Sequence, residues 1–186
     1  TPGAVRRVPV NTFFSGPAGG VVGCVGLGAE LGLKDLITFD MGGTSTDVCL
    51  IHGGEAARKD LREMAGFPVR TRTMDIHTIG AGGGSIAWVD AGGLLKVGPQ
   101  SAGAYPGPAA YGRGGTKPTV TDANVLLGRL NPKSLLGGRM AMHADRAREV
   151  IEKELVPKLG VDVVRAAAGV IEIINVNMMG AVRVIS

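Results

Sequence analysis

The chain has 186 residues, of which 45% are hydrophobic and 19% charged, and its formal net charge at pH 7 is +4. This length allows one domain with a real core, and the hydrophobic content excludes a disordered chain. The basic residues are scattered and form no stripe, so the charge gives little support to nucleic-acid binding and we expect no nucleic-acid partner.

The N-terminal part predicts one helix after an extended lead-in. Residues 1–14 read as extended and basic. Ser15 then offers an N-cap, Pro17 stands in the first turn, and Ala18 to Leu31 is small and apolar up to Gly32. Glycines inside a helix lower its stability, and this one contains Gly19, Gly20, Gly23, Gly26 and Gly28. We therefore expect the helix to be buried, in close contact with a sheet or another helix.

Residues Leu36 to Ile51, LITFDMGGTSTDVCLI, predict a β-hairpin. In the first arm Ile37 and Phe39 alternate with polar residues, which is the pattern of a strand with two unlike faces. Val48 to Ile51 is β-branched and apolar, as in a buried strand. The two arms enclose a turn that is rich in glycine and hydroxyl residues.

This turn predicts a phosphate-binding site. Gly42 and Gly43 can adopt positive φ and carry no Cβ, so backbone N–H groups can close on an anion. Hydroxyl donors are added by Thr44, Ser45 and Thr46. Asp40 and Asp47 flank the turn, and carboxylates beside a phosphate make sense if a divalent cation separates them. Mg²⁺ suits this role because it takes few protein carboxylates. The alternative is an ordinary turn, since these residue types favour turns.

The next segment predicts strands and a pair of chemically active side chains. Glu55 to Gly66 has no clear state, whereas Phe67 to Thr73 alternates like a strand. The alternation continues to Ile79, which would place Asp75 and His77 on one face of a strand. A carboxylate and an imidazole at that spacing can converge on one metal ion or one proton. The alternative is a histidine that is merely hydrogen-bonded.

A second glycine-rich loop, GAGGG at residues 80–84, is another candidate for anion binding, through Gly82 and Gly83. It is no dinucleotide fingerprint, because a strand (Ser85 to Asp90) and not a helix follows it. A hairpin turn then leads into a strand at Leu94 to Val97. Residues 98–117 show little periodicity, and a long loop of this kind usually borders a functional site.

Helices complete the chain. Thr121 is an N-cap for a short helix at Ala123 to Leu127, and Asp122 in its first turn either stabilises the helix dipole or contacts a metal ion or substrate. After a loop at 131–138, apolar residues recur at helical spacing in Asp145 to Leu159 and again in Val161 to Ile185, which predicts two amphipathic helices with core-facing stripes.

Two cysteines, Cys24 and Cys49, lie in apolar segments, and no CxxC pair occurs. They predict reduced, buried thiols in a cytoplasmic protein. No apolar run reaches the roughly 18 residues of a membrane span, so we expect no membrane partner. The chain begins without methionine and stops inside a helical pattern, which is typical of a piece of a longer protein.

Several motifs together resemble one family. FDMGGTSTDV is similar to the second phosphate hairpin of the actin, hexokinase and Hsp70 ATPase superfamily. The further motifs that resemble the hydantoinase A/5-oxoprolinase family in particular are SGPAGGVVG (15–23), TIGAGGGSIAWVD (78–90), VGPQSAGAYPGPAAYGRGG (97–115) and PTVTDANVLLGRL (118–130). Family members commonly have the sequence GPACYGRGG here, with a cysteine where this chain has Ala110. Any role of that thiol cannot be filled by Ala110 in this chain.

The resemblance implies an α/β fold, part of the ribonuclease H-like lobe of actin-like ATPases. In that fold residues 1–52 and 118–186 would form the lobe, with an inserted β-rich, glycine-rich region at 53–117. The superfamily closes two phosphate hairpins around the nucleotide, and this chain contains one. We therefore expect little ATPase or hydrolase activity from the chain alone.

The resemblance also implies a function: ATP-dependent hydrolysis of a cyclic amide such as hydantoin or 5-oxoproline, through phosphorylation of the amide oxygen, with a second subunit or domain as partner. In this scheme the turn at 42–46 holds the phosphates, and Asp40 and Asp47 hold Mg²⁺ or orient water. Asp75 and His77 are further candidates for catalysis, and Asp122 for metal binding. Two alternatives stay open, namely a subunit of an ATP-dependent ketone carboxylase and a nucleotide-binding module in the manner of Hsp70.

Overall fold

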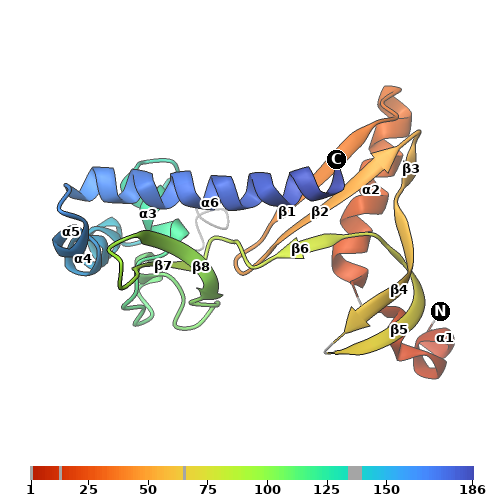
Figure 1. Cartoon of the computed structure of the whole chain (residues 1–186), viewed down its shortest axis with the longest axis horizontal. Coiled ribbons are helices and arrows are strands. Elements are labelled where there is room, and N and C mark those ends of the chain that lie inside the picture. The colour runs from red at the N-terminus through yellow and green to blue at the C-terminus, as the bar shows by residue number, and fades with distance from the viewer. Residues whose placement is uncertain (1, 13, 65, 134–139) are drawn as a thin grey trace. The chain divides into compact units, whose positions relative to one another are not determined.

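The computed structural model describes residues 2–12, 14–64, 66–133 and 140–186. The chain divides into two compact units (Figure 1). Unit 1 comprises Thr1–Asp40, Asp47–Thr78 and Ala181–Ser186, and unit 2 comprises Met41–Thr46 and Ile79–Gly180. The region predicted as an insertion, residues 53–117, therefore divides between both units at Thr78 and forms no compact unit of its own. That it is an insertion stays a prediction.

Short helices occupy the N-terminal segment, so the predicted extended lead-in is wrong. Helix α1 spans Pro2–Arg7 and the 3₁₀ helix η1 spans Pro9–Thr12. Each of them begins with a proline, whose fixed φ suits the first residue of a helix and whose missing N–H costs nothing there. Extended structure was predicted because proline also breaks regular structure, and the pattern alone does not separate the two roles.

Helix α2 (Ser15–Leu31) forms as predicted and ends at Gly32, which has a φ of 70° in the left-handed region. Its start differs slightly. Ser15 is the first helical residue and not the cap, and the residue before it, Phe14, has a φ of 62° and makes no side-chain cap bond. The carbonyl oxygen of Gly28 accepts the N–H of Leu33 (2.8 Å), which closes the C-terminal end of the helix.

Unit 1 is built on a four-stranded sheet in which β2 (Thr46–His52) pairs with β1 (Leu36–Met41), β3 (Glu55–Ala56) and β6 (His77–Ile79). The predicted hairpin is thus confirmed. One face of α2 packs on this sheet through a small core of Val21, Cys49, Ile51 and Ile76, with Ala18, Cys24, Val25 and Leu36 around it. Neither cysteine is in a disulfide bond; Cys49 is buried and Cys24 is half-buried.

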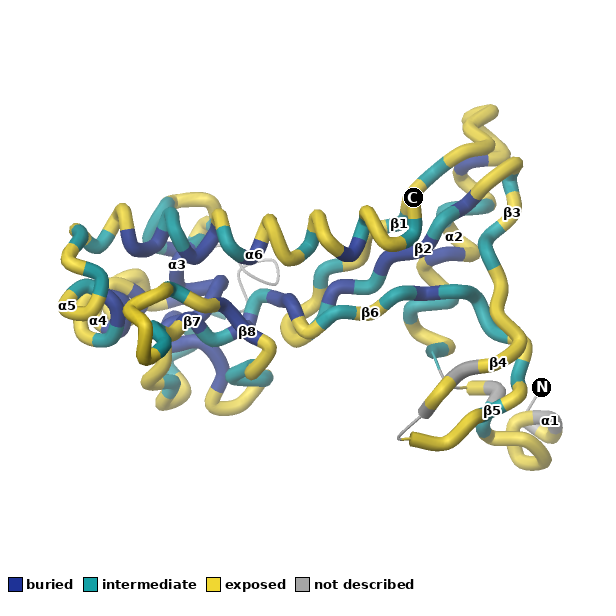
Figure 2. Tube along the Cα trace, in the orientation of Figure 1, coloured by how far each residue is buried: buried dark blue, intermediate teal, exposed yellow. Residues whose placement is uncertain are grey.

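Most of α2 is exposed within this chain, so the prediction of a buried helix is wrong (Figure 2). Val21 and Gly28 are its buried residues, while Val22 and Leu27 are each 57% exposed. Gly28 alone among the five glycines has a packing reason, because a Cβ there would lie 2.8 Å from the carbonyl oxygen of Leu33. The sheet covers one side of the helix, and no described residue covers the other glycine positions closely.

A second hairpin in unit 1 consists of β4 (Arg58–Met64) and β5 (Phe67–Met74), which pair antiparallel with an irregularity between Lys59 and Leu61. Strand β5 confirms the strand predicted from its alternation. Its partner β4 was not predicted, because charged residues interrupt the apolar period that identifies a strand.

Unit 2 contains the antiparallel pair β7 (Ser85–Val89) and β8 (Leu95–Ser101) and the helices η2 (Ala109–Tyr111), α3 (Val120–Leu126), α4 (Ala144–Glu154) and α5 (Val156–Leu159). Most of α6 (Val163–Ile185) belongs to it as well. The core of the unit is small and aliphatic, as the composition predicts, with Val97, Val120, Ile151, Leu155, Val170 and Ile174 among its buried members.

The C-terminal helices lie where the periodicity predicts them, except that one predicted helix is broken in two. The single helix expected at 145–159 is divided between α4 and α5 at Leu155. Pro157 lies two residues further on, and a proline inside a helix removes a backbone donor and clashes with the preceding turn. Residues 134–138 of the predicted loop lie outside the described residues.

One helix in the described part of the chain, α6, is long and apolar enough to cross a membrane, with a mean hydropathy of 1.5 in its best window. A helix of this kind was not predicted, because Arg165, Glu172 and Arg183 interrupt the apolar run. Its residues Ala167, Val170 and Ile174 are buried in the core of unit 2, although only 22% of the apolar window is buried. A single helix of this kind gives weak support for a membrane span, and the absence of a membrane partner stays a prediction.

Candidate functional site

The turn of the β1–β2 hairpin is fixed by the glycine-rich loop at residues 80–84. Within the turn, the N–H of Gly42 donates to the carbonyl oxygen of Ser45 (2.8 Å). From the loop, the N–H of Gly83 donates to the carbonyl oxygen of Gly42 (3.0 Å), and the N–H of Gly84 donates to that of Gly43 (2.6 Å). The two glycine-rich motifs, far apart in sequence, therefore form one hydrogen-bonded layer in unit 2.

The contact is so close that it requires glycine. A Cβ at Gly82 would lie 2.7 Å from the backbone nitrogen of Thr44 and 2.8 Å from the carbonyl oxygen of Gly42. The buried hydroxyl of Thr46 adds a hydrogen bond of 2.6 Å to the carbonyl oxygen of Ala81. On its other side the loop is held by α3, because the N–H of Thr121 donates to the carbonyl oxygen of Gly83 (2.7 Å).

These bonds orient the turn's remaining donors. In a trans peptide the N–H points opposite to the C=O of the same peptide unit, and the cis bonds of this chain lie elsewhere, before Pro99 and Pro106. Because the carbonyls of Gly42 and Gly43 point toward the loop, the N–H groups of Gly43 and Thr44 point away from it. No described residue accepts a hydrogen bond from either group, and both residues are exposed. Two adjacent outward N–H groups are a simple anion-binding arrangement.

Positive φ was one expected reason for glycine in the turn, and the structure does not show it. Neither Gly42 nor Gly43 has a positive φ. A Cβ at Gly43 would meet no atom within 4 Å. Within this chain, therefore, neither backbone conformation nor packing requires glycine at position 43.

Neither Gly82 nor Gly83 has a free backbone N–H group for the predicted contact with an anion. The N–H of Gly82 donates to the hydroxyl of Ser85 (2.9 Å), and the N–H of Gly83 is used by Gly42. In this structure both residues support the turn, and a direct contact with a cofactor stays a prediction.

Asp40 and Asp47 line one pocket of unit 1, with a volume of about 230 Å³. The first half of α2 contributes Pro17, Gly20, Val21 and Cys24 to the lining, and Thr38, Phe39 and Ile76 complete it. One carboxylate oxygen of Asp47 accepts a hydrogen bond of 2.5 Å from the hydroxyl of Thr78, which restrains its orientation. Residues from the first half of α2 thus share this pocket with the two carboxylates.

The donor set of this pocket fits Mg²⁺. That ion binds through one or two protein carboxylates and completes its shell with water and phosphate oxygens. No cluster of three or more His, Cys, Asp or Glu side chains exists among the described residues. A site that provides the whole coordination shell from such side chains is therefore not found in that part of the chain, whereas a two-carboxylate magnesium site needs no such cluster.

Asp75 and His77 do not share one strand face, so that prediction is wrong. Strand β5 ends at Met74 and β6 begins at His77. Between them the chain bends, with the N–H of Ile76 donating to the carbonyl oxygen of Met74 (2.9 Å). The alternation in the sequence ran through a bend, which periodicity does not detect. A catalytic role for either residue stays a prediction.

Asp122 is a buried structural carboxylate in unit 2. Its Oδ2 accepts from the N–H (2.9 Å) and the hydroxyl (2.7 Å) of Thr119, and its Oδ1 accepts from the N–H of Ala110 (2.8 Å). Burial raises the pKa of Asp122 above its ordinary value, although the hydrogen bonds to the carboxylate oppose the shift. These contacts favour the helix-capping role over the metal role, which stays a prediction.

The cap of α3 lies two residues earlier than predicted. Thr119 caps α3, and it forms a capping box with Asp122. The spacing Thr-x-x-Asp at 119–122 is the signal that identifies it. Thr78 and Ser85, which hold Asp47 and Gly82, were also missed, and a single hydroxyl residue beside a loop gives no pattern by which to find it.

Comparison with known proteins gives consistent matches. Residues 1–186 match the family model described as hydantoinase/oxoprolinase. The chain is 41% identical over 186 residues to the alpha subunit of caprolactamase from Pseudomonas jessenii, covering 100% of this chain and 27% of that protein.

Two solved structures are similar throughout most of the chain. The nucleotide-free structure of acetone carboxylase, from work on ATP-dependent acetone carboxylation, gives a TM-score of 0.81 at 38% identity and covers 88% of this chain and 23% of that one. ATP-dependent caprolactamase from Pseudomonas jessenii gives a TM-score of 0.78 at 42% identity, covering 87% and 24%. The likeness confirms the predicted fold class, an α/β lobe of the actin-like ATPase type. The chain spans about a quarter of the length of these relatives.

Proposed function

The chain belongs to the hydantoinase/oxoprolinase family, and from this premise we propose that it is the phosphate-binding part of an ATP-dependent enzyme that opens a cyclic amide. Membership confirms the resemblance expected from the motifs. The cyclic amide reading is supported by the similarity to caprolactamase subunit alpha, which extends over the whole chain at 41% identity.

The observation that carries the proposal is the pair of outward N–H groups at Gly43 and Thr44. They are held in place from behind by the hydrogen bonds from Gly83 and Gly84, so they need no reorganisation when an anion arrives. Donors fixed in this way stabilise charge more effectively than mobile ones. In the proposed role they bind the terminal phosphate oxygens of ATP, with the hydroxyl of exposed Thr44 beside them.

Asp40 and Asp47 would hold Mg²⁺, which would neutralise the phosphate charge, and ATP would supply the phosphoryl group that activates the amide oxygen. The residues of this chain contribute positioning. The hydrogen bond from Thr78 fixes one oxygen of Asp47, which leaves its other oxygen for the ion or for a bound water. An unstrained amide resists attack by water, so activation of its oxygen is the step for which the energy of ATP is needed.

A second candidate is ATP-dependent carboxylation of a ketone. It is favoured by the likeness to acetone carboxylase, with a TM-score of 0.81. The same turn would serve both reactions, because each requires that the nucleotide is bound. The difference between them must lie in substrate-binding residues, and none of the site residues discussed above discriminates an amide from a ketone.

The experiment uses the full-length protein together with its proposed partner subunit. ATP-dependent product formation is measured with caprolactam, 5-oxoproline and hydantoin, and in parallel with acetone plus bicarbonate. We expect turnover with a cyclic amide and none with the ketone. The reverse result would assign the protein to the carboxylases, and ATP-independent turnover of every substrate would refute the proposed role of the turn.

A further inference from the structure

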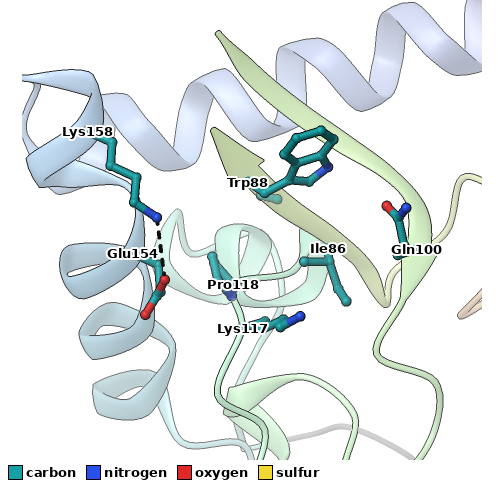
Figure 3. Close-up of a pocket in the computed structure, with 8 residues that line it drawn as sticks. Ile86, Trp88, Gln100, Lys117, Pro118, Glu154 and Lys158 are labelled. Atoms are coloured by element: carbon teal, nitrogen blue, oxygen red, sulfur yellow. Dashed lines mark ion pairs between the residues drawn. The ribbon is translucent and has the colours of Figure 1, made fainter. Parts of the chain in front are cut away.

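Unit 2 contains a pocket of about 430 Å³ whose lining includes none of the predicted site residues. The β7–β8 hairpin forms one side and the end of α4 with α5 forms the other (Figure 3). It is lined by Ile86, Ala87, Trp88, Gln100, Lys117, Pro118, Glu154 and Lys158. Its volume is within the range of small-molecule sites in proteins.

Strand β7 gives the pocket an apolar side that contains a fixed aromatic ring. Ile86 and Trp88 are two residues apart on β7 and so share one face of the strand. The indole N–H of Trp88 donates to the carbonyl oxygen of Gly98 (3.2 Å), which holds the ring and satisfies its single donor. Trp88 is nevertheless 41% exposed. A held and partly exposed indole provides a flat apolar surface for a ligand.

Apart from Pro118, the remaining lining is polar and carries a net positive charge. Lys158 is paired with Glu154 at 3.7 Å, and both are partly exposed. Lys117 is exposed and forms no ion pair with a described residue. Gln100 adds an amide from β8. The two ammonium groups and one carboxylate leave a single excess positive charge.

We propose that this pocket binds a small organic monoanion, a carboxylate attached to a flat apolar body. The body lies on Trp88 and Ile86, and the carboxylate faces Lys117 and Lys158. A phosphate dianion fits less well, because Glu154 would repel it and the lining contains neither an arginine fork nor a set of converging backbone N–H groups. The inference concerns a site that the proposed phosphate-binding function does not use.

The chain provides its own reporter, because Trp88 is the single tryptophan among its 186 residues. Fluorescence of the 186-residue chain, excited at the red edge of indole absorption, is titrated with benzoate as the probe and with benzamide as its neutral isostere. We expect saturable quenching with benzoate and at least a fivefold weaker response with benzamide. Calorimetry with Trp88→Phe, which keeps an aromatic ring, checks binding without the reporter.

Three variants test the charges. Lys117→Gln and Lys158→Gln should each weaken benzoate binding by about 3- to 10-fold, which corresponds to the modest worth of exposed charge pairs. Lys153→Gln, on α4 but not in the lining, is the matched control and should bind as the parent does. All three positions are exposed, so the variants should fold, which circular dichroism checks.

Equal binding of benzoate and benzamide, or unchanged affinity in both Lys117→Gln and Lys158→Gln, would overturn the proposal. Absence of a saturable response up to tens of millimolar would do the same. AMP is included as a further probe. If it quenches Trp88 more tightly than benzoate and competes with it, the pocket is a nucleotide site and the carboxylate assignment is wrong.

Discussion

The N–H of Gly84 donates to the carbonyl oxygen of Gly43 at 2.6 Å, and through this bond the loop at 80–84 fixes a turn that has two free donors. The arrangement separates two tasks between two glycine-rich motifs. Residues 80–84 use their backbone groups inside the protein, and the turn at 42–45 directs its own outward. We expect glycine to matter in each motif for a different reason, and this difference can be tested by mutation.

Gly82→Ala should destabilise unit 2. Its methyl group would lie 2.7 Å from the backbone nitrogen of Thr44 and 2.8 Å from the carbonyl carbon of Gly43, and backbone atoms held by hydrogen bonds move only at a cost. We expect the free energy of unfolding in urea to fall by about 1–3 kcal/mol. Gly23→Ala on α2 is the control, since nothing lies within 4 Å of its added carbon. Equal stability of the two variants would contradict the close contact.

Gly43→Ala should leave stability nearly unchanged and impair nucleotide binding. The added carbon meets no atom within 4 Å of the protein, and the φ of Gly43 is not positive. Unfolding should therefore stay within about 1 kcal/mol of the parent. The methyl group nevertheless stands beside the outward N–H groups, where a phosphate would approach. Calorimetry of the full-length protein with a non-hydrolysable ATP analogue and Mg²⁺ should show at least a tenfold weaker affinity, and parental affinity would exclude the turn from the site.

Thr46→Val tests the bond between the hairpin and the loop. The buried hydroxyl donates to the carbonyl oxygen of Ala81 at 2.6 Å, and valine has the same shape without the donor. The carbonyl would be left without its partner in a buried position, at a cost of about 1–3 kcal/mol in the free energy of unfolding. Thr44→Val is the matched control, because Thr44 is exposed and its contact with the hydroxyl of Ser101 is long, at 3.5 Å. It should cost less than about 0.5 kcal/mol.

Elements with a strong local signal could be predicted from the sequence. The hairpin at 36–51, strand β7 and helix α6 were each found within a few residues, because an apolar period or a glycine stop marks them. The turn at 42–46 was also predicted, since its composition is unusual. Composition does not indicate which atom a backbone N–H or C=O group will bond to. That Gly83 and Gly84 donate to the turn, and not to a ligand, follows from tertiary contact alone.

The errors have the same physical origin. Residues 2–7 and 9–12 form short helices because proline is tolerated at a first helical position. The exposure of α2 was not predicted, because a glycine-rich apolar helix has the same sequence pattern whether one side or both sides are covered. Asp75 and His77 were placed on one strand because alternation continued through a bend. A local sequence pattern therefore predicts the type of an element better than it predicts what surrounds that element. The surroundings decide what a side chain can do.

Asp47→Asn should abolish Mg-ATP-dependent turnover of the full-length enzyme while the fold persists. The variant keeps an oxygen that can accept from Thr78, whose bond to Asp47 measures 2.5 Å, but it loses the charge that a magnesium ion requires. We expect a loss of at least a hundredfold in the rate of phosphate release at saturating substrate. Asp60→Asn, an exposed acid of unit 1 outside the pocket, is the control and should keep parental activity. Near-normal turnover of Asp47→Asn would remove this residue from the site.

Asp122→Asn should lower stability and change its dependence on pH. One of the carboxylate oxygens that serve Thr119 and Ala110 is replaced by a donor, so buried donors face each other, and we expect a loss of about 2–4 kcal/mol in the free energy of unfolding. The pH dependence follows from burial, which raises the pKa of Asp122 above its ordinary value of 3.8. The folded state then keeps its proton to a higher pH than the unfolded state does, and unfolding releases that proton.

The contribution of Asp122 to stability is therefore fully present below pH 3.8 and declines as pH rises through the raised pKa. The asparagine variant has no such titration. Urea unfolding at a series of pH values from about 3.5 to 7 should show that the stability advantage of the parent over Asp122→Asn is largest at the acid end and shrinks toward neutral pH. Asp35 and Asp90, whose pKa values are lowered by backbone hydrogen bonds from Gly53 and from Leu94, change stability in the opposite direction in both proteins and cancel in the difference. An advantage that grows with pH would show that the carboxylate is charged in the folded state, and a metal ion beside it would then become the better explanation of its burial.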